Sequence, residues 1–211
     1  MRAKDLEISD LLKVDPEGGR IQFGNQRSLL LDAVALGLLK KQLVDLLGFS
    51  GARGVLTKFG YSHGWRTADS LERGFAWDDA GEWRRAGGRL HTLQGLVRVE
   101  ALPEADVAGE PVAASLWHDS YEAQQHLLQL GQAEEPVCWT LTGFASGYMT
   151  RCHQRPVYAI ETGCVGKGDP VCQVELRPKE SWEPERLALH LPFYEGECLN
   201  AALSELTQQL H

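Results

Sequence analysis

Three consecutive runs give the clearest structural pattern in the chain: Pro156-Val-Tyr-Ala-Ile-Glu161, then Gly163-Cys-Val-Gly-Lys-Gly-Asp-Pro170, then Cys172-Gln-Val-Glu-Leu176. The first and last runs contain the aliphatic and β-branched residues that strands favour, and the middle run is rich in glycine. Glycine, aspartate and proline are typical of turns. The stretch therefore predicts a β-hairpin whose tip has room to bend around something.

The predicted tip places one carboxylate, Glu161, beside two thiols, Cys164 and Cys172. Cys138 lies near the start of the helix predicted to precede the hairpin, so it can supply a fourth ligand. Zinc accepts thiolate and carboxylate ligands in a tetrahedron, and four protein ligands leave no position for a catalytic water. The spacing indicates a structural zinc site rather than a catalytic one.

Two alternatives to this site remain open from the residues alone. Buried cysteines are common without any metal. Cys152-His153 offers a competing pair of ligands at the end of the predicted helix, ahead of Pro156. Cys198 is predicted to be a plain thiol.

Upstream of the hairpin, the pattern predicts two more strands and two helices. Residues 96–101 and 112–117 alternate between apolar and polar residues on either side of an acidic loop. Asp119-Ser120-Tyr121-Glu122 fits a capping box that opens a helix to about Leu130, and a further helix is expected from about Pro136. We expect an α+β fold, with an antiparallel sheet flanked by helices.

The first ninety residues are predicted to be mainly helical after a short strand at Arg20–Phe23. Asn25 can cap a helix that is apolar on more than one face, which favours burial on two sides, either under the domain or against a second subunit. Residues 1–50 are therefore expected to form a helical dimerisation segment. Ser50 can cap a second helix, and a third over residues 78–93 is expected to be interrupted at Gly87-Gly88.

Near the C-terminus, leucines recur at a regular spacing over a short stretch. Leu199, Leu203, Leu206 and Leu210 recur at steps of four, three and four. This spacing is typical of a coiled coil but covers less than two heptads. A linker helix and an amphipathic helix packed on the domain both remain open.

Composition excludes several classes of protein. The 211 residues have a formal net charge of -8, and the basic residues form no stripe that could follow a phosphate backbone. We expect no direct contact with nucleic acid. The chain shows no run of eighteen apolar residues and no signal peptide, so no membrane contact and a cytoplasmic location are expected. Five cysteines in such a chain indicate thiols or metal ligands rather than disulfides.

Two sets of residues resemble known sensors. The run Cys138…Tyr158-Ala-Ile-Glu161-Thr-Gly-Cys164…Gly168-Asp-Pro-Val-Cys172 resembles the four-vinyl-reductase domain. Gly88-Arg-Leu-His91-Thr-Leu-Gln-Gly-Leu-Val97 and Ser115-Leu-Trp117 resemble the XylR-type N-terminal region. Together they resemble the sensor half of phenol- and toluene-responsive, sigma-54-dependent activators, over nearly the whole chain.

This resemblance implies roles for particular residues. The zinc ligands of the family fall on Cys138, Glu161, Cys164 and Cys172. The two residues that bind the phenolic hydroxyl fall on His91 and Trp117, which suits a hydroxyl that both donates and accepts a hydrogen bond. Tyr148 occupies one aromatic position of the pocket, while some others are smaller residues here. Phe144, four residues earlier on the same helix face, is a further candidate.

The resemblance also implies a function and a division of the chain. The family member is a homodimeric sensor without catalytic activity that binds phenol or a related small aromatic compound and restrains a downstream ATPase domain. Residues 51–178 would form the sensor domain, with the zinc-binding part at about 119–178, and residues 179–211 the C-terminal linker. The alternative is a small enzyme of aromatic or tetrapyrrole metabolism built on the same domain, which would need a cofactor or an acid and a base.

Overall fold

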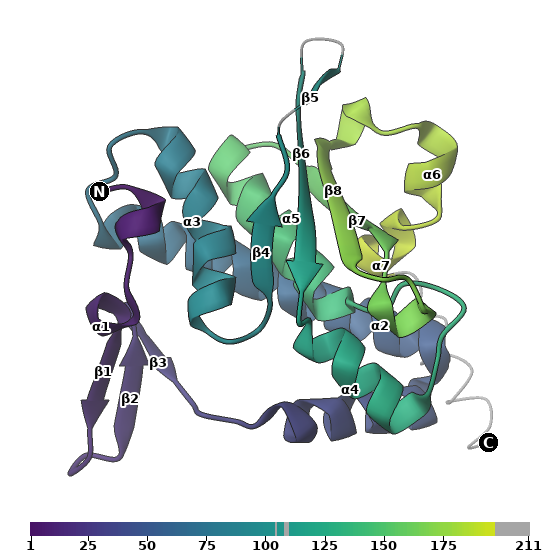
Figure 1. Ribbon diagram of the computed structural model, residues 1–211, viewed down its shortest axis with the longest axis horizontal. Helices are drawn as coiled ribbons and strands as arrows, with labels where there is room; N and C mark the ends of the chain where they lie inside the picture. Colours follow the sequence, from purple (N-terminus) through teal and green to yellow (C-terminus); the bar gives the residue numbers. More distant parts are fainter. Residues whose placement is uncertain (104, 108–109, 197–211) are drawn as a thin grey trace.

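The computed structural model describes residues 1–103, 105–107 and 110–196, and its centre is an antiparallel sheet backed by helices (Figure 1). The strands lie in the order β4-β6-β8-β7, and β5 pairs with one end of β6. The α+β prediction is therefore confirmed. The strands are β4 (Arg98–Ala101), β5 (Ala105–Val107), β6 (Glu110–His118), β7 (Val157–Gly163) and β8 (Cys172–Pro178).

The predicted hairpin is formed by β7 and β8 and closed by a short 3-10 helix, η2 (Val165–Lys167). A register shift between Glu161 and Gly163 marks the tip. Both faces of β7 are buried: Val157 and Ala159 belong to the main core, whereas Tyr158 and Ile160 pack with Trp182 and Leu187. A strand buried on both faces needs the continuous apolar run that the sequence has there.

Four long helices surround the sheet, and α2 and α5 lie behind it (Figure 1). Within the described residues, no helix combines the length and apolar character needed to cross a bilayer. The helices are α2 (Ala33–Gly74), α3 (Ala80–Leu93), α4 (Tyr121–Leu130) and α5 (Trp139–His153). After β8 follow η3 (Lys179–Ser181), α6 (Pro184–Ala188) and α7 (Leu191–Glu195). The four leucines of the predicted coiled coil lie outside the described residues.

The N-terminal segment is not helical throughout, contrary to expectation. It forms a small antiparallel sheet that stands away from the body (Figure 1), and the expected strand at Arg20–Phe23 is its central strand, β2. Asn25 caps no helix, because Gly24 at φ 61° and Asn25 form the turn between β2 and β3. The other elements are η1 (Ala3–Asp5), α1 (Ile8–Leu11), β1 (Leu12–Asp15) and β3 (Gln26–Ser28).

Helix α2 begins at Ala33, where the Asp32 carboxylate accepts a hydrogen bond from Ala35 N at 2.8 Å. It bends at Gly48, whose φ of 68° is accessible to glycine at little cost. The helix break predicted near Ser50 is therefore real but lies two residues earlier. Residue 50 lies inside α2, and the proposed division of the chain at that point stays a prediction.

Gly87 and Gly88 do not interrupt α3, contrary to expectation. A Cβ atom at Gly87 would lie 2.9 Å from the Tyr148 ring, and one at Gly88 would lie 3.2 Å from Val99. The glycines therefore permit close approach of α3 to α5 and to β4.

The crossing of α2 and α5 depends on four more glycines. These helices make the most extensive contact between any two described elements. An added Cβ at Gly60 or Gly64 would overlap a backbone carbonyl oxygen of α5, and one at Gly143 or Gly147 would overlap a carbonyl oxygen of α2. Each helix therefore has two glycines four residues apart, on one face, at the point of closest approach.

A methyl group at this crossing should force the two helices apart. We expect Gly60→Ala to cost at least about 1–3 kcal/mol of unfolding free energy, or roughly 3–10 °C in thermal midpoint. Gly74→Ala is the control, because its added Cβ would meet only Asn25 at 3.5 Å. Thermal unfolding followed by circular dichroism measures both. Equal midpoints for the two variants would contradict the proposed packing.

Candidate ligand pocket and metal centre

The structure brings the four predicted metal ligands together. Cys138 is the N-cap residue of α5, Glu161 lies in β7, Cys164 precedes η2 and Cys172 begins β8. One ligand atom from each lies within 4.8 Å of the others, and all four residues are buried. Residues up to 34 positions apart, Cys138 and Cys172, thus meet at the tip of the hairpin.

The spacing of the atoms suits a tetrahedral thiolate site. Cys138 Sγ lies 3.8 Å from Cys172 Sγ, which lies 3.9 Å from Cys164 Sγ. A zinc ion with bonds of about 2.3 Å to sulfur would separate its tetrahedral ligands by about 3.8 Å. Glu161 accepts a hydrogen bond from Cys138 N through Oε2 at 3.0 Å, but its Oε1 is buried without a hydrogen-bond partner. A metal ion is the kind of partner that this oxygen lacks.

The electrostatics of the cluster also favour a cation. Burial raises the pKa of the Cys138 thiol and of the Glu161 carboxyl well above their usual values. Hydrogen bonds from the Cys138 and Cys172 thiols lower the pKa of Cys164 to about 2. Without a cation, burial therefore disfavours ionisation of Cys138 and Glu161, and a bound metal would allow both groups to ionise.

The competing pair Cys152-His153 lies at the opposite end of α5 from Cys138. The helix has 15 residues, which corresponds to about 22 Å. This pair therefore contributes nothing to the cluster at the hairpin tip, and Cys198 lies outside the described residues.

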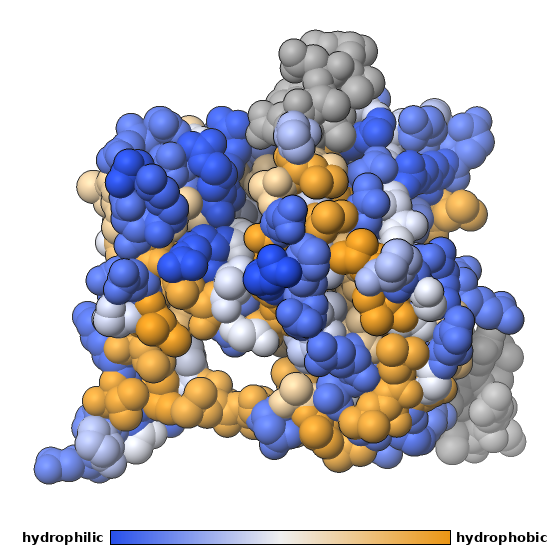
Figure 2. Space-filling model, viewed as in Figure 1, coloured by the Kyte–Doolittle hydropathy of each residue, from blue (hydrophilic) through white to orange (hydrophobic). Residues whose placement is uncertain are grey.

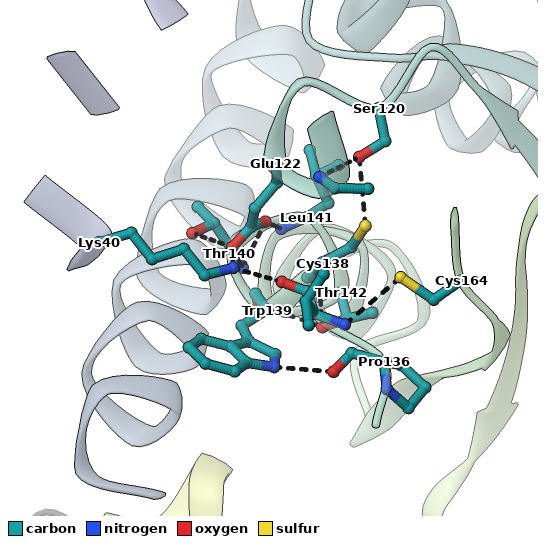
Figure 3. A network of polar contacts seen from close by, with 12 residues as sticks. Lys40, Ser120, Glu122, Pro136, Cys138, Trp139, Thr140, Leu141, Thr142 and Cys164 are labelled. Atoms are coloured by element: carbon teal, nitrogen blue, oxygen red, sulfur yellow. Dashed lines mark hydrogen bonds and ion pairs between the residues drawn. The ribbon is translucent and has the colours of Figure 1, made fainter. Parts of the chain in front are cut away.

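A buried ion pair supports the start of α5 (Figure 3). Lys40 Nζ lies 3.2 Å from Glu122 Oε1 and donates to Val137 O at 2.5 Å. Glu122 also accepts hydrogen bonds from the backbone N–H groups of Thr140 and Leu141. The carboxylate thus occupies the positive end of the α5 dipole, directly beside the ligand Cys138, where the N-cap side chain provides no cap.

Removal of the Glu122 charge should be costly, because it leaves a buried ammonium group without its counter-ion. We expect Glu122→Gln to lose about 3–5 kcal/mol of unfolding free energy in urea denaturation. Asp45→Asn is the matched control, since Asp45 pairs with Lys41 on the surface of α2; its loss should stay below about 0.5 kcal/mol. A loss under about 1 kcal/mol for Glu122→Gln would contradict this role.

The four predicted ligand-binding residues line one pocket. The pocket has a volume of about 680 Å³ and lies between α3, α5 and the face of β4, β6 and β8. His91 extends from α3, Trp117 from β6, and Phe144 and Tyr148 from α5. Each of these side chains is at least 97% buried.

Among the pocket residues, His91 indicates most clearly that a ligand binds here. Its Nε2 atom is buried without a hydrogen-bond partner, and burial lowers its pKa to about 3. The imidazole is therefore neutral near pH 7 and can exchange a hydrogen bond with a neutral ligand. Its ring lies 4.1 Å from that of Phe144, centroid to centroid.

Tyr148 contributes a ring face rather than a hydroxyl. Its hydroxyl donates to Trp83 O at 2.7 Å, so that group is already satisfied. The Tyr148 ring is stacked with that of Phe144 at 6.0 Å. Together these rings give the α5 side of the pocket an aromatic surface.

The pocket and the metal ligands share one face of the sheet. Trp117 on β6 is the direct cross-strand partner of Cys172 on β8 and of Val99 on β4. Residues directly opposite in an antiparallel pair project to the same face. The cluster and the pocket are therefore neighbours, with Trp117 and Cys172 side by side.

Two features of this site were not predicted from the sequence. The Lys40–Glu122 pair joins residues 82 positions apart, for which no local pattern exists. Arg84 also lines the pocket, and its Nε is buried without a partner. The sequence could have indicated Arg84 as a pocket residue, because Arg84 and His91 are seven residues apart and so lie on one face of α3.

A largely apolar pocket beside a closed cluster of metal-type ligands defines a small-molecule-binding module. Two family models match the chain: one described as an activator of aromatic catabolism, over residues 7–106, and the four-vinyl-reductase domain, over residues 117–178. The chain is 31% identical over 183 residues to the phenol regulator MopR of Acinetobacter guillouiae. It is 31% identical over 186 residues to the transcriptional regulatory protein XylR of Pseudomonas putida.

These matches cover 85% and 86% of this chain, which spans about a third (33%) of the length of either relative. The crystal structure of the phenol-responsive sensory domain of the transcription activator PoxR with phenol is similar, with a TM-score of 0.78 and 34% identity over 91% of this chain and 94% of that one. The chain therefore belongs to the family of sensor regions of aromatic-responsive transcription activators.

A more distant structure shares the fold alone. It is a trafficking protein particle complex subunit 3 from Naegleria fowleri covalently bound to palmitic acid, with a TM-score of 0.50 and 14% identity. The alignment covers 72% of this chain and 97% of that one. The fold therefore extends beyond transcription regulators.

Proposed function

We propose that this sensor region binds phenol or a related small aromatic compound in the pocket lined by His91 and Trp117. The observation that carries the proposal is the neutral, buried His91, whose Nε2 lacks a partner in the pocket. A phenolic hydroxyl supplies that partner, and the Trp117 indole N–H is the second group proposed to bind it. Phe144 and Tyr148 would pack against the aromatic ring.

Contacts with a ligand as small as phenol can supply the affinity that such a sensor needs. Very small ligands gain up to about 1–1.5 kcal/mol per heavy atom, so the seven heavy atoms of phenol support roughly micromolar binding. No charge pair is required.

We propose zinc as the metal of the Cys138, Glu161, Cys164 and Cys172 cluster. The support is a set of three sulfurs and one carboxylate oxygen within 4.8 Å, all buried. With four protein ligands the ion would connect α5 to both strands of the hairpin and perform no chemistry. Because Cys172 adjoins Trp117, a metal there would also stabilise one side of the pocket.

The signal would leave the pocket through α5. Phe144 and Tyr148 face the pocket, whereas Ser146 bonds the Tyr194 hydroxyl of α7 at 2.9 Å and accepts from Ala159 N at 2.8 Å. A ligand that favours one position of α5 would therefore shift the docking of α7, and with it the linker proposed for residues 179–211. In the full-length activator, this shift would relieve repression of a downstream ATPase domain.

The sensor is proposed to act as a homodimer. Apolar side chains gather along the lower edge of the molecule, where the segment between β3 and α2 runs (Figure 2). A second copy would cover this exposed apolar surface. Its members are Leu29, Leu30, Leu31, Val34 and Leu38.

The enzyme of aromatic or tetrapyrrole metabolism is not favoured, because the matched relatives are regulatory proteins. We therefore expect phenol to be recovered unchanged after incubation with the protein.

Calorimetry with phenol tests the proposed ligand site. We expect micromolar binding with one phenol per chain, and a loss of about 10- to 100-fold for His91→Ala, because one end of the hydroxyl loses its partner. His118→Ala is the control, since His118 pairs with Glu100 and is not a pocket residue. Undiminished affinity in a folded His91→Ala protein would remove His91 from the site.

Elemental analysis of protein purified without chelator tests the metal. We expect about one zinc per chain, because structural sites hold the ion tightly. Cys172→Ser should lose it, whereas Cys152→Ser should retain it. Less than about half an equivalent in the unaltered protein would count against a structural zinc.

A further inference from the structure

The lining of the pocket is rich in basic residues, although the chain as a whole is acidic. The formal net charge is -8, yet five Lys and Arg residues and a single acidic residue, Glu82, are among the described residues that line the pocket. The basic residues are Lys4, Arg84, Arg85, Arg89 and Arg98. Such a concentration of one sign of charge favours a ligand of the opposite sign.

Several of these cations already have partners. Arg85 lies 2.8 Å from Glu82, Arg89 Nε donates to Leu6 O at 3.0 Å, and Arg98 lies 3.9 Å from Glu100. Arg84 differs: within the described part of the chain it makes no ion pair or hydrogen bond, and its Nε is buried. A buried guanidinium nitrogen without an acceptor is costly, so an acceptor from a ligand would relieve that cost.

Arg84 and His91 mark the two ends of one face of α3. They are seven residues apart, which is two helical turns and about 10 Å. Between them on the same face lie Gly87 and Gly88, which present backbone where other residues would present side chains. The two buried side-chain nitrogens that lack partners thus lie two helical turns apart along the pocket, and between them the Tyr148 ring packs on Gly87 and Val99 packs on Gly88.

The pocket is also larger than phenol requires. At roughly the 30 Å³ that liquid water takes per heavy atom, the seven heavy atoms of phenol would fill about 210 Å³. The pocket measures about 680 Å³. Space therefore remains beyond a ring that is bound at His91.

We propose that the effector of this sensor is a phenolic carboxylate, with its hydroxyl at His91 and its carboxylate at Arg84. The inference rests on the proposed function, since it extends the same pocket. Guanidinium matches carboxylate in a planar, two-bond geometry, which gives specificity as well as affinity. The ring would lie in the pocket between these two groups, beside the aromatic side chains of α5.

This inference differs from simple phenol sensing in whether a phenolic acid binds more tightly or more weakly than its own ester. An anion that enters a pocket without a free cation loses its hydration and binds more weakly than its neutral ester. An anion that reaches Arg84 binds more tightly than the ester, because the charge is paired and the buried nitrogen gains an acceptor.

The test is calorimetry on the full chain with phenol, 4-hydroxybenzoate, 4-hydroxyphenylacetate and the methyl esters of the two acids. The two acids differ in length, so they sample the span between Arg84 and His91. We expect at least one acid to bind about tenfold or more tightly than its own ester. Phenol binding without a preference for either acid would overturn the inference but leave the proposed function intact. Failure of phenol and of all four other probes to bind would overturn both.

Variants then locate the preference. Arg84→Gln should abolish the preference for the acid and leave phenol affinity within about twofold, whereas Arg84→Lys should retain part of it. Arg85→Gln is the matched control, because Arg85 is exposed and paired with Glu82. A preference that survives Arg84→Gln would assign the carboxylate to another group and overturn the inference. If Arg84→Gln does not fold, loss of the bidentate contact in Arg84→Lys supplies the same test: an undiminished preference there counts against it.

Discussion

The backbones of α2 and α5 are in direct contact, and these two helices pack together more extensively than any other pair of described elements. Four glycines allow this contact, and no larger side chain fits at any of them. The contact fixes α5, and α5 carries a part of every site: Cys138 at its start, Phe144 and Tyr148 at the pocket, and Ser146 beneath α7. A small displacement of this one helix would therefore move residues at the predicted metal ligands, at the pocket and beneath the C-terminal helices together.

The metal ligands and the pocket are joined through the sheet. Trp117 and Cys172 are cross-strand partners, so the hairpin that supplies two of the three sulfurs also borders the strand that lines the pocket. The Lys40–Glu122 pair adds a second support, since it satisfies the first backbone N–H groups of α5. In this arrangement a structural metal would do no chemistry but would keep one side of the pocket in place.

Sequence reasoning succeeded where the determining chemistry is local. The apolar runs around the glycine-rich tip predicted β7 and β8, and the ligand types near that tip predicted the cluster. The predicted start of α4 was right, but the capping box was not: Ser120 caps the helix through its own hydroxyl, and the Glu122 carboxylate binds Lys40 and the start of α5 instead. Prediction from the sequence failed where tertiary contacts decide the local structure. Asn25 lies in the turn between β2 and β3, and Gly87-Gly88 stays helical because α5 and β4 pack closely on α3 at these two residues. The shared pocket of His91 and Trp117 followed from the resemblance, not from spacing.

We propose that a phenolic hydroxyl completes the hydrogen bonding of the buried, neutral His91. A crystal structure of the protein with bound phenol would show this contact. We expect the phenol oxygen within about 3 Å of His91 Nε2, with the ring beside Trp117 and Phe144. Phenol bound elsewhere, with Nε2 still without a partner, would contradict it.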